Sequence, residues 1–382
     1  MMEDLRLLEL ALTHRVMKAG PLSQAEYCDW KARIIAASGG RNALLMDDEG
    51  FPSVMLRFEP PQGADLLDGA DKALHPAFVA GGKTLGSLWL AKYPCCRILH
   101  AGREHFLSLR GTDSAQHIGY DRAVEACGQK GAGWHMMTNV EYAFLALLCR
   151  KNGFEPHGNT CYGTYALNSA ETGAVVDFYA YNPLKPGRLL TGSGPANWAH
   201  DATDAGMYEL NGNVWEWAAG LRMVDGEIQI LPDNDAALPG ADLSEMSRSW
   251  RAISPSGELL IPQSGAPTPG AVGFCWNSDC QRWEMGARFQ AEGDKQNCAF
   301  QDVFAQGEIS NLHFFQRLGL LPPGREWRQD CFFACGSGER LAARGGSYIR
   351  GETSGIFALL LTDGRDRTDS DRIGFRLGFI SS

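Results

Sequence analysis

The sequence of 382 residues lacks the features of a membrane protein or a nucleic-acid-binding protein. It has no apolar run close to the roughly 18 residues of a membrane-spanning helix, and no Lys/Arg-rich run of the kind that neutralises phosphates. Its formal net charge is −10, so a protein of this charge is repelled by nucleic acid and by anionic membranes, which are negative as well. We therefore expect neither nucleic-acid binding nor membrane insertion.

The first residues, MMEDLRLLELALTHRVMKAG, lack the basic start, the continuous apolar core and the cleavage site of a signal peptide. We expect synthesis in the cytoplasm; association with a phage particle or a non-classical export route would need no such segment.

The 11 cysteines show no framework spacing, which fits a reducing compartment better than a disulfide scaffold. Cys275-x4-Cys280 and Cys331-x3-Cys335 fit either a split zinc site or buried thiols. Neither pair has the tight C-x2-C spacing of zinc sites, which favours thiols. We expect no metal and no other cofactor.

The composition, 44% hydrophobic, is that of a folded globular chain. Residues 4–18 repeat leucines at helical spacing, residues 22–37 can form a second helix, and residues 53–60 alternate like a strand. We interpret residues 1–60 as an N-terminal appendage or an oligomerisation element.

Two further helices are expected after residue 61. One covers residues 120–130, and the next begins after Thr138, which can cap it together with Glu141, and ends at Gly153. Residues 155–330 are rich in Gly, Asn, Asp and Trp and predict irregular structure, with residues 312–321 as the one later stretch that fits a helix.

The strongest local signature is NGNVWEW, residues 211–217. Asn and Gly tolerate left-handed backbone angles, so the Asn-Gly-Asn stretch predicts a turn. In the strand that follows, Trp215 and Trp217 share one face and Glu216 lies on the other. Taken alone, these residues fit a structural turn with two core aromatics as well as a functional site.

Together with GWHMMTNVEYAFLALLC (133–149), RGGSY (344–348) and GFRLGF (374–379), this motif resembles the formylglycine-generating-enzyme branch of the C-type lectin fold. The resemblance implies an α+β lectin-like domain over residues 61–382. Two helices would flank a small, mostly antiparallel sheet with much irregular loop, interrupted by an insertion at about 225–330.

Enzymes of that branch bind copper through two cysteines, at positions that correspond to about Thr353 and Ala358, and no cysteine follows Cys335. The related sulfoxide synthases hold iron with histidines of an N-terminal domain, where this chain has only His14. No G-x-S-x-G or H-E-x-x-H motif is present either. We expect no catalytic residues; an oxygen-dependent enzyme of either kind is the alternative.

Near the C-terminus, GIFALLL (355–361) alternates, so Phe357, Leu359 and Leu361 share one face and Leu360 is expected to face outward. The loop TDGRDRTDSDR (362–372) follows, with four aspartates and three arginines. Such a loop fits either a solvated connection or a ligand surface built on rigid strands.

The whole stretch RGGSYIRGETSGIFALLLTDGRDRTDSDRIGFR (344–376) resembles the variable region of proteins diversified by retroelements. The resemblance implies a non-catalytic receptor-recognition protein whose partner is an unknown protein or cell-surface ligand. The expected ligand-binding residues are Tyr348, Ile349, Arg350, Thr353, Leu360, Thr362, Asp363, Arg365, Arg367, Asp369 and Asp371. The expected scaffold residues are Asn211, Gly212, Asn213, Trp215, Trp217, Gly345, Gly346, Phe357, Gly374, Phe375 and Arg376.

Overall fold

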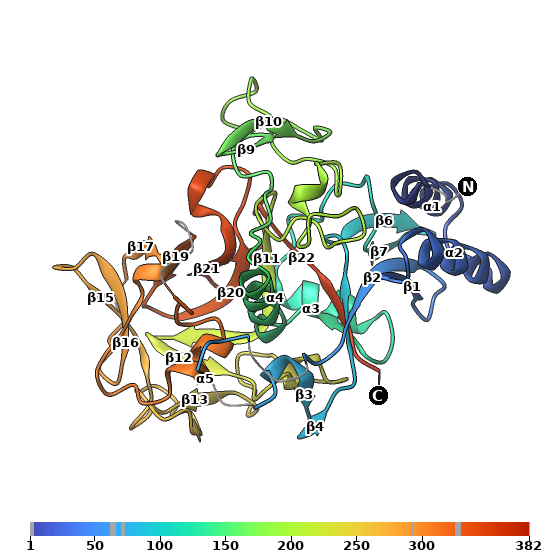
Figure 1. Ribbon diagram of the computed structural model, residues 1–382. Helices are drawn as coiled ribbons and strands as arrows, with labels where there is room; N and C mark the ends of the chain where they lie inside the picture. The colour runs from blue at the N-terminus through green and yellow to red at the C-terminus, as the bar shows by residue number, and fades with distance from the viewer. Residues whose placement is uncertain (1–3, 62–65, 70–72, 292, 325–329, 382) are drawn as a thin grey trace.

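A computed structural model describes residues 4–61, 66–69, 73–291, 293–324 and 330–381. It shows a mixed α/β structure with few helices and two main sheets (Figure 1). Within the described residues, no helix is long and apolar enough to cross a membrane. The α-helices are α1 (Leu5–Ala19), α2 (Gln24–Ala37), α3 (Tyr120–Gly128), α4 (Asn139–Lys151) and α5 (Leu312–Arg317).

The N-terminal helices form as their sequence predicts. Leucines at helical spacing on α1 are buried, and α2 begins with a capping box between Ser23 and Glu26. The predicted capping box of Thr138 and Glu141 is present at the start of α4. Local signals of this kind depend on residues three or four apart, so they can be found without knowledge of the tertiary structure.

The first sheet has five strands in the order β1-β2-β5-β23-β8. It combines strands from the N-terminal region with the last strand of the chain. The bounds are β1 (Asn42–Met46), β2 (Pro52–Phe58), β5 (Leu88–Ala91), β8 (Trp134–Met136) and β23 (Leu377–Phe379). Residues 1–60 thus contribute two strands to a sheet shared with the rest of the chain, while the division at residue 60 stays a prediction.

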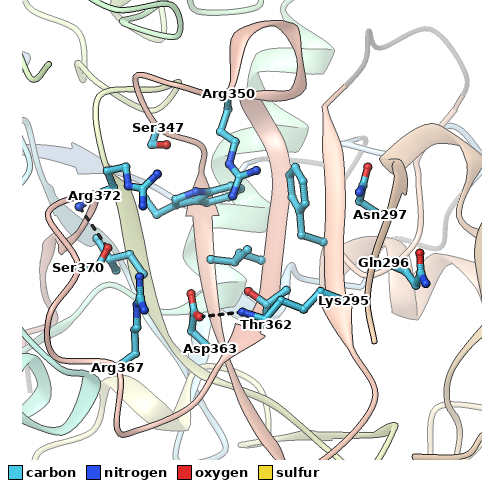
Figure 2. Close-up of a pocket in the computed structure, with 14 residues that line it drawn as sticks. Lys295, Gln296, Asn297, Ser347, Arg350, Thr362, Asp363, Arg367, Ser370 and Arg372 are labelled. Carbon is cyan, nitrogen blue, oxygen red and sulfur yellow. Dashed lines mark hydrogen bonds and ion pairs between the residues drawn. The ribbon is translucent and has the colours of Figure 1, made fainter. Parts of the chain in front are cut away.

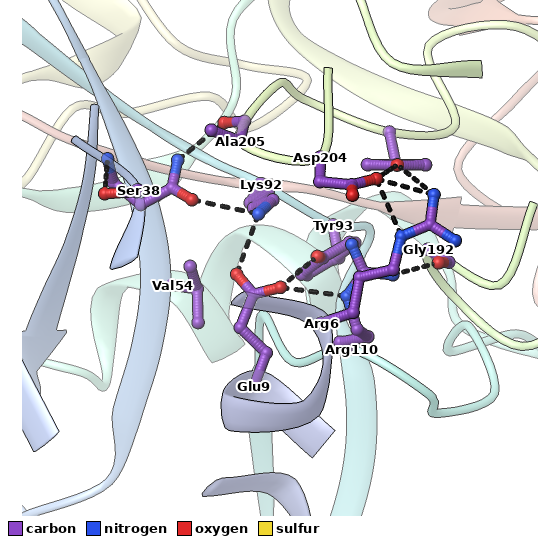
Figure 3. A network of polar contacts seen from close by, with 12 residues as sticks. Arg6, Glu9, Ser38, Val54, Lys92, Tyr93, Arg110, Gly192, Asp204 and Ala205 are labelled. Atoms are coloured by element: carbon purple, nitrogen blue, oxygen red, sulfur yellow. Dashed lines mark hydrogen bonds and ion pairs between the residues drawn. The ribbon is translucent and has the colours of Figure 1, made fainter. Parts of the chain in front are cut away.

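A buried ionic network also joins α1 to the rest of the molecule (Figure 3). The Glu9 carboxylate accepts hydrogen bonds from Lys92 Nζ, Tyr93 Oη and Arg110 Nε, each at 2.8 Å. Lys92 Nζ also donates to Asn42 Oδ1 at 2.9 Å. Buried charges are stable only when paired, so this network fixes the position of α1.

The second sheet has 12 strands along the path β17-β19-β21-β20-β11-β12-β15-β16-β18, with β13, β14 and β22 joined beside it. Its bounds are β11 (Trp215–Val224), β12 (Glu227–Ile230), β13 (Arg251–Ile253), β14 (Leu259–Leu260), β15 (Gly273–Asn277), β16 (Arg282–Gly286), β17 (Lys295–Ala299), β18 (Phe304–Ala305), β19 (Cys331–Cys335), β20 (Glu339–Gly345), β21 (Gly355–Asp363) and β22 (Ile373–Phe375). The remaining strands form two-stranded pairs: β3 (Val79–Ala80), β4 (Lys83–Thr84), β6 (Cys96–His100), β7 (Arg103–Leu107), β9 (Thr164–Tyr165) and β10 (Asn168–Thr172).

The predicted arrangement, two helices beside a small sheet, is wrong. Residues 225–330, expected to be an irregular insertion, contribute β12 to β18 to the large sheet. These strands have only two to five residues each, so their periodicity is weak in the sequence. In Figure 1, β15 and β16 lie at the opposite end of the molecule from α1 and α2.

Both faces of the large sheet are buried around β11 and β21. Phe357, Leu359 and Leu361 pack in one hydrophobic cluster with residues of α4. Ala358 and Leu360 pack in another, with residues of α3. Alternation predicted the two faces of β21 correctly, but the outward position of Leu360 is wrong because a second layer covers that face.

Candidate functional site

One pocket, with a volume of about 310 Å³, lies against the C-terminal region (Figure 2). Its walls come from β17, β19, β21 and the segment that leads to β22. The lining residues are Trp215, Phe333, Leu360 and Ile373, the cationic Lys295, Arg350, Arg367 and Arg372, the acidic Asp363, and the neutral polar Gln296, Asn297, Ser347, Thr362 and Ser370.

Strand register places the lining side chains beside one another. Asn297 on β17 pairs with Phe333 on β19, and Phe333 pairs with Leu360 on β21. Paired residues point to the same face of a sheet, so these three form a row across the pocket. On the neighbouring pair, Trp215 of β11 lies opposite Ile373 of β22.

The pocket is cationic, with four basic side chains and one acid. Lys295 Nζ lies 3.8 Å from Asp363 Oδ1, an ion pair drawn in Figure 2. The guanidinium of Arg350 stacks over the Phe333 ring, with Cζ 4.5 Å from the ring centroid. Burial, together with the charge of Arg372, lowers the pKa of Arg350. A ligand that brings negative charge would relieve this repulsion.

The structure brings together five of the residues expected to bind ligand. These are Arg350, Leu360, Thr362, Asp363 and Arg367. Their side chains come from a turn, a strand and a loop, and they meet at one cavity. Their role in ligand binding stays a prediction.

The other expected ligand-binding residues lie outside this lining. Arg365 is held by Glu339, with Nε 2.7 Å from Oε2, and by an ion pair to Asp121. Thr353 Oγ1 donates to the Arg350 carbonyl at 2.7 Å. Ile349, which is half-buried, Asp369, Asp371 and Tyr348 also lie outside the lining.

Two of the expected ligand contacts are buried rather than exposed. Tyr348 is 1% exposed, and its hydroxyl donates to Asp371 Oδ2 at 3.2 Å. Leu360 is 3% exposed and reaches a ligand only through the pocket. The expectation that Leu360 faces outward is wrong, because the second layer covers it. Tyrosines at 162 and 179 pack around Tyr348, whose role in ligand binding stays a prediction.

The Asn-Gly-Asn turn supports the Gly-Gly-Ser turn directly. Gly212 N donates to the Gly345 carbonyl at 3.0 Å, and Tyr348 N donates to the Asn213 carbonyl at 3.1 Å. Gly346 has φ of 93°, and a Cβ there would lie 2.3 Å from Ser354 Oγ. Only glycine fits such a position, so the start of the predicted variable segment is rigidly held. Asn211 Nδ2 donates to the Pro156 carbonyl at 3.0 Å.

A buried ion pair holds the end of the same segment. Arg376, fully buried, donates from Nε and Nη2 to the two carboxylate oxygens of Glu216 at 2.8 Å each. It also donates to the carbonyls of Ala91 and Tyr208. Trp217 and Phe375 are fully buried nearby, and a Cβ at Gly374 would lie 2.4 Å from the Ala115 carbonyl.

Sequence reasoning missed the part of the pocket that β17 and β19 supply. Lys295, Gln296 and Asn297 lie in the region expected to be irregular, and Phe333 was not considered. The continuous apolar run of residues 331–335 (CFFAC) is the available signal for a buried strand there. Arg372 was left out because the register of the preceding loop was not fixed.

The cysteine pairs considered for zinc are separated in the structure. Cys275 lies on β15, whereas Cys331 and Cys335 are buried on β19. In the described part of the chain, no group of three or more His, Cys, Asp or Glu side chains is placed to hold a metal ion.

Comparisons with known proteins give only distant similarities. No family model and no curated protein matches the sequence. Among solved structures, PvdO from Pseudomonas aeruginosa aligns at a TM-score of 0.31 and 12% identity, covering 89% of this chain and 98% of that one. The Major Tropism Determinant P3c variant aligns at 0.29 and 12%, covering 89% and 71%. Values this low assign neither fold nor function, so the functional proposal rests on the site.

Proposed function

We propose that the protein is a non-catalytic, ligand-binding protein of the receptor-recognition type, and that a retroelement diversifies its C-terminal segment 344–376. One observation carries the proposal. Five residues expected to vary, Arg350, Leu360, Thr362, Asp363 and Arg367, line a single pocket although the expectation came from sequence alone. A ligand in that pocket would contact the varied side chains together.

The surroundings of the pocket support the same proposal. Diversification needs a fold whose stability does not depend on the varied side chains, since core losses cost several kcal/mol and surface changes usually about 0.5 kcal/mol or less. The segment is held at its start by Gly212 and Asn213 and at its end by the Glu216–Arg376 pair. Its anchors are therefore distinct from the residues that face the pocket.

We further propose a lectin-like domain over residues 61–382, preceded by the N-terminal region 1–60. The partner would be a protein or a cell-surface ligand. Residues 225–330 would then be an addition that supplies one wall of the pocket through β17.

Sequencing of the DNA that flanks the gene tests the diversification. We expect a near-copy of the codons for residues 344–376 beside a reverse transcriptase gene, differing mainly where the copy has adenine. The differences should fall on the codons of pocket residues such as Arg350 and Arg367 and spare those of Phe357 and Phe375. A near-copy whose differences fall mainly on scaffold codons such as those of Phe357 and Phe375, or no near-copy at all, would refute the diversification.

An exchange experiment tests recognition separately. Fluorescently labelled protein is screened for binding to a panel of bacterial cells, and residues 348–372 are then replaced by those of another variant. We expect binding to the original cells to be lost. Replacement of the exposed residues 263–267 serves as the control and should leave binding intact. Binding that survives the first exchange would place recognition elsewhere.

A further inference from the structure

Arg350 stands out among the charged residues of the pocket. It is half-buried, and among the residues that the structure describes it forms no ion pair, whereas each of the other basic side chains in the pocket has an acid nearby. In Figure 2, the side chains of Arg350 and Arg372 both extend into the pocket below Ser347. Two guanidinium groups so placed repel each other unless a negative charge lies between them.

Two acids of the C-terminal segment that lie near the pocket are engaged with other partners. Asp363 pairs with Lys295 at 3.8 Å. Asp371 pairs with Arg372 at 3.2 Å and accepts the Tyr348 hydroxyl. Neither forms an ion pair with Arg350 within the described ranges, and Asp363 attracts its charge only from beyond ion-pair distance.

Several hydrogen-bond donors of the pocket are also unused. Arg350 Nε, Arg367 Nε and Ser347 Oγ are buried and have no hydrogen-bond partner among the described residues. Ser347 is 1% exposed and lines the pocket. A buried donor without a partner costs about 1–3 kcal/mol, so three of them at one cavity indicate a site that an acceptor completes.

The stacking contact fixes how Arg350 presents its donors. With Cζ 4.5 Å from the centroid of the Phe333 ring, one face of the guanidinium is covered, and its Nε has no hydrogen-bond partner among the described residues. The edge that carries Nε and an Nη atom forms paired hydrogen bonds with two oxygens of a carboxylate, a sulfate or a phosphate. Ser347 can donate to the same group or to a second oxygen.

We infer that the pocket contains an oxyanion subsite, in which Arg350, Arg372 and Ser347 bind a carboxylate, sulfate or phosphate group of the ligand. The inference rests on the proposed ligand-binding function and specifies the chemistry of one part of the ligand. The apolar neighbours Phe333, Leu360 and Trp215 would contact the body that carries the anionic group.

Titration with small probes tests the subsite. Glutarate supplies a carboxylate and inorganic sulfate a tetrahedral oxyanion, with glucose as a neutral probe, all at constant ionic strength set with sodium chloride. Trp215 lines the pocket, so tryptophan fluorescence reports binding, and calorimetry gives the affinity. We expect saturable 1:1 binding of glutarate or sulfate and none of glucose; the stronger of the two identifies the preferred oxyanion.

Two substitutions make the test specific. Arg350→Met keeps a side chain that packs on Phe333 but removes charge and donors, and should weaken anion binding at least about tenfold. Arg350→Lys keeps the positive charge but loses the paired donors of the guanidinium. Its affinity for the anion should lie between those of wild type and Arg350→Met. Arg103→Met, at an exposed ion pair with Glu49, is the matched control and should bind like wild type.

The outcomes separate this inference from the proposed function. Without anion, Arg350→Met should unfold at the wild-type temperature or above it, because it removes an unpaired charge and an unsatisfied buried donor. No binding of either anion, or equal binding by wild type and Arg350→Met, overturns the subsite. Loss of cell binding on exchange of residues 348–372 would in either case still support recognition by the segment, since that readout does not depend on the probes.

Discussion

The buried carboxylate of Glu9 gives the sharpest test of how the N-terminal region is attached. Glu9 is fully buried, and its two oxygens are shared among Lys92, Tyr93 and Arg110 (Figure 3). Glu9→Gln keeps the shape of the side chain, removes its charge and replaces one acceptor oxygen with an NH2 donor. Two cations, Lys92 at 0% and Arg110 at 4% side-chain exposure, then lose their counter-charge.

The expected loss follows from the burial of these groups. Removing one partner of a buried ion pair costs about 3–5 kcal/mol, against a total stability of about 5–15 kcal/mol for a typical domain. An exposed ion pair contributes only about 0–1 kcal/mol. The pair of Glu49 with Arg103, whose arginine side chain is 66% exposed, is such a case, so Glu49→Gln serves as the control.

The loss should also depend on pH. Burial lowers the pKa of Lys92 to about 8, and the attraction of Glu9 keeps it from falling further. In Glu9→Gln this attraction is absent, so the pKa of Lys92 in the folded protein falls further. Lys92 is then neutral in the folded variant at a pH where it is charged in wild type. The folded state then binds fewer protons than the unfolded chain, and stability rises with pH. We therefore expect the difference in free energy of unfolding between wild type and Glu9→Gln to become smaller from pH 6 to pH 9.

Urea denaturation followed by tryptophan fluorescence measures both effects. Glu9→Gln should lower the midpoint of the main transition strongly at pH 6 and less at pH 9, while Glu49→Gln should stay within about 1 kcal/mol of wild type at both. A cost for Glu9→Gln as small as that of the control would refute the reasoning. It would mean that α1 detaches without affecting the rest of the molecule, as a loosely attached appendage would.

Two further predictions concern the core and the charge of another buried acid. Phe375→Ala should lower the free energy of unfolding by about 3–5 kcal/mol, whereas Arg367→Ala should change it by about 0.5 kcal/mol or less. Thermal denaturation measures both; equal losses would contradict the assignment of Phe375 to the core and Arg367 to the surface. Burial raises the pKa of Glu209 from 4.5 to about 7, so its contribution to stability, about 3 kcal/mol, is lost as pH rises from about 4.5 through 7. The stability of Glu209→Gln should not fall over this pH range. If the stability of the variant and of wild type changed in parallel with pH, the prediction would be wrong.

The sequence predicted well those features that local interactions decide. The helix α4 begins at Thr138 because Thr138 and Glu141 cap each other within one turn. The Asn-Gly-Asn turn forms because Gly212 adopts φ of 79°, a conformation that glycine accepts without strain. Neither feature needs information about distant parts of the chain.

The features that the sequence did not reveal depend on what packs against a strand. The alternation in residues 355–361 separates two faces, but it cannot say whether one of them meets solvent. Leu360 was expected outside and is buried at 3% exposure, because Trp215, Trp217 and α3 cover that side. The wall that β17 supplies was missed for a related reason, since its partner β19 is more than 30 residues away in sequence and no local pattern marks the pairing.

Two arginines of the C-terminal segment show how the same residue type takes opposite roles. Arg376 is fully buried, and its donors are used by Glu216 and by two backbone carbonyls. Arg350 is half-buried, lies near another arginine and leaves Nε without a partner among the described residues. A satisfied buried charge fixes the fold, whereas an unsatisfied one is maintained at a cost to the fold. Such a cost is expected at a binding site, and for this reason the charge balance of Arg350, more than its position in a variable-looking segment, supports the proposal that a ligand binds in this pocket.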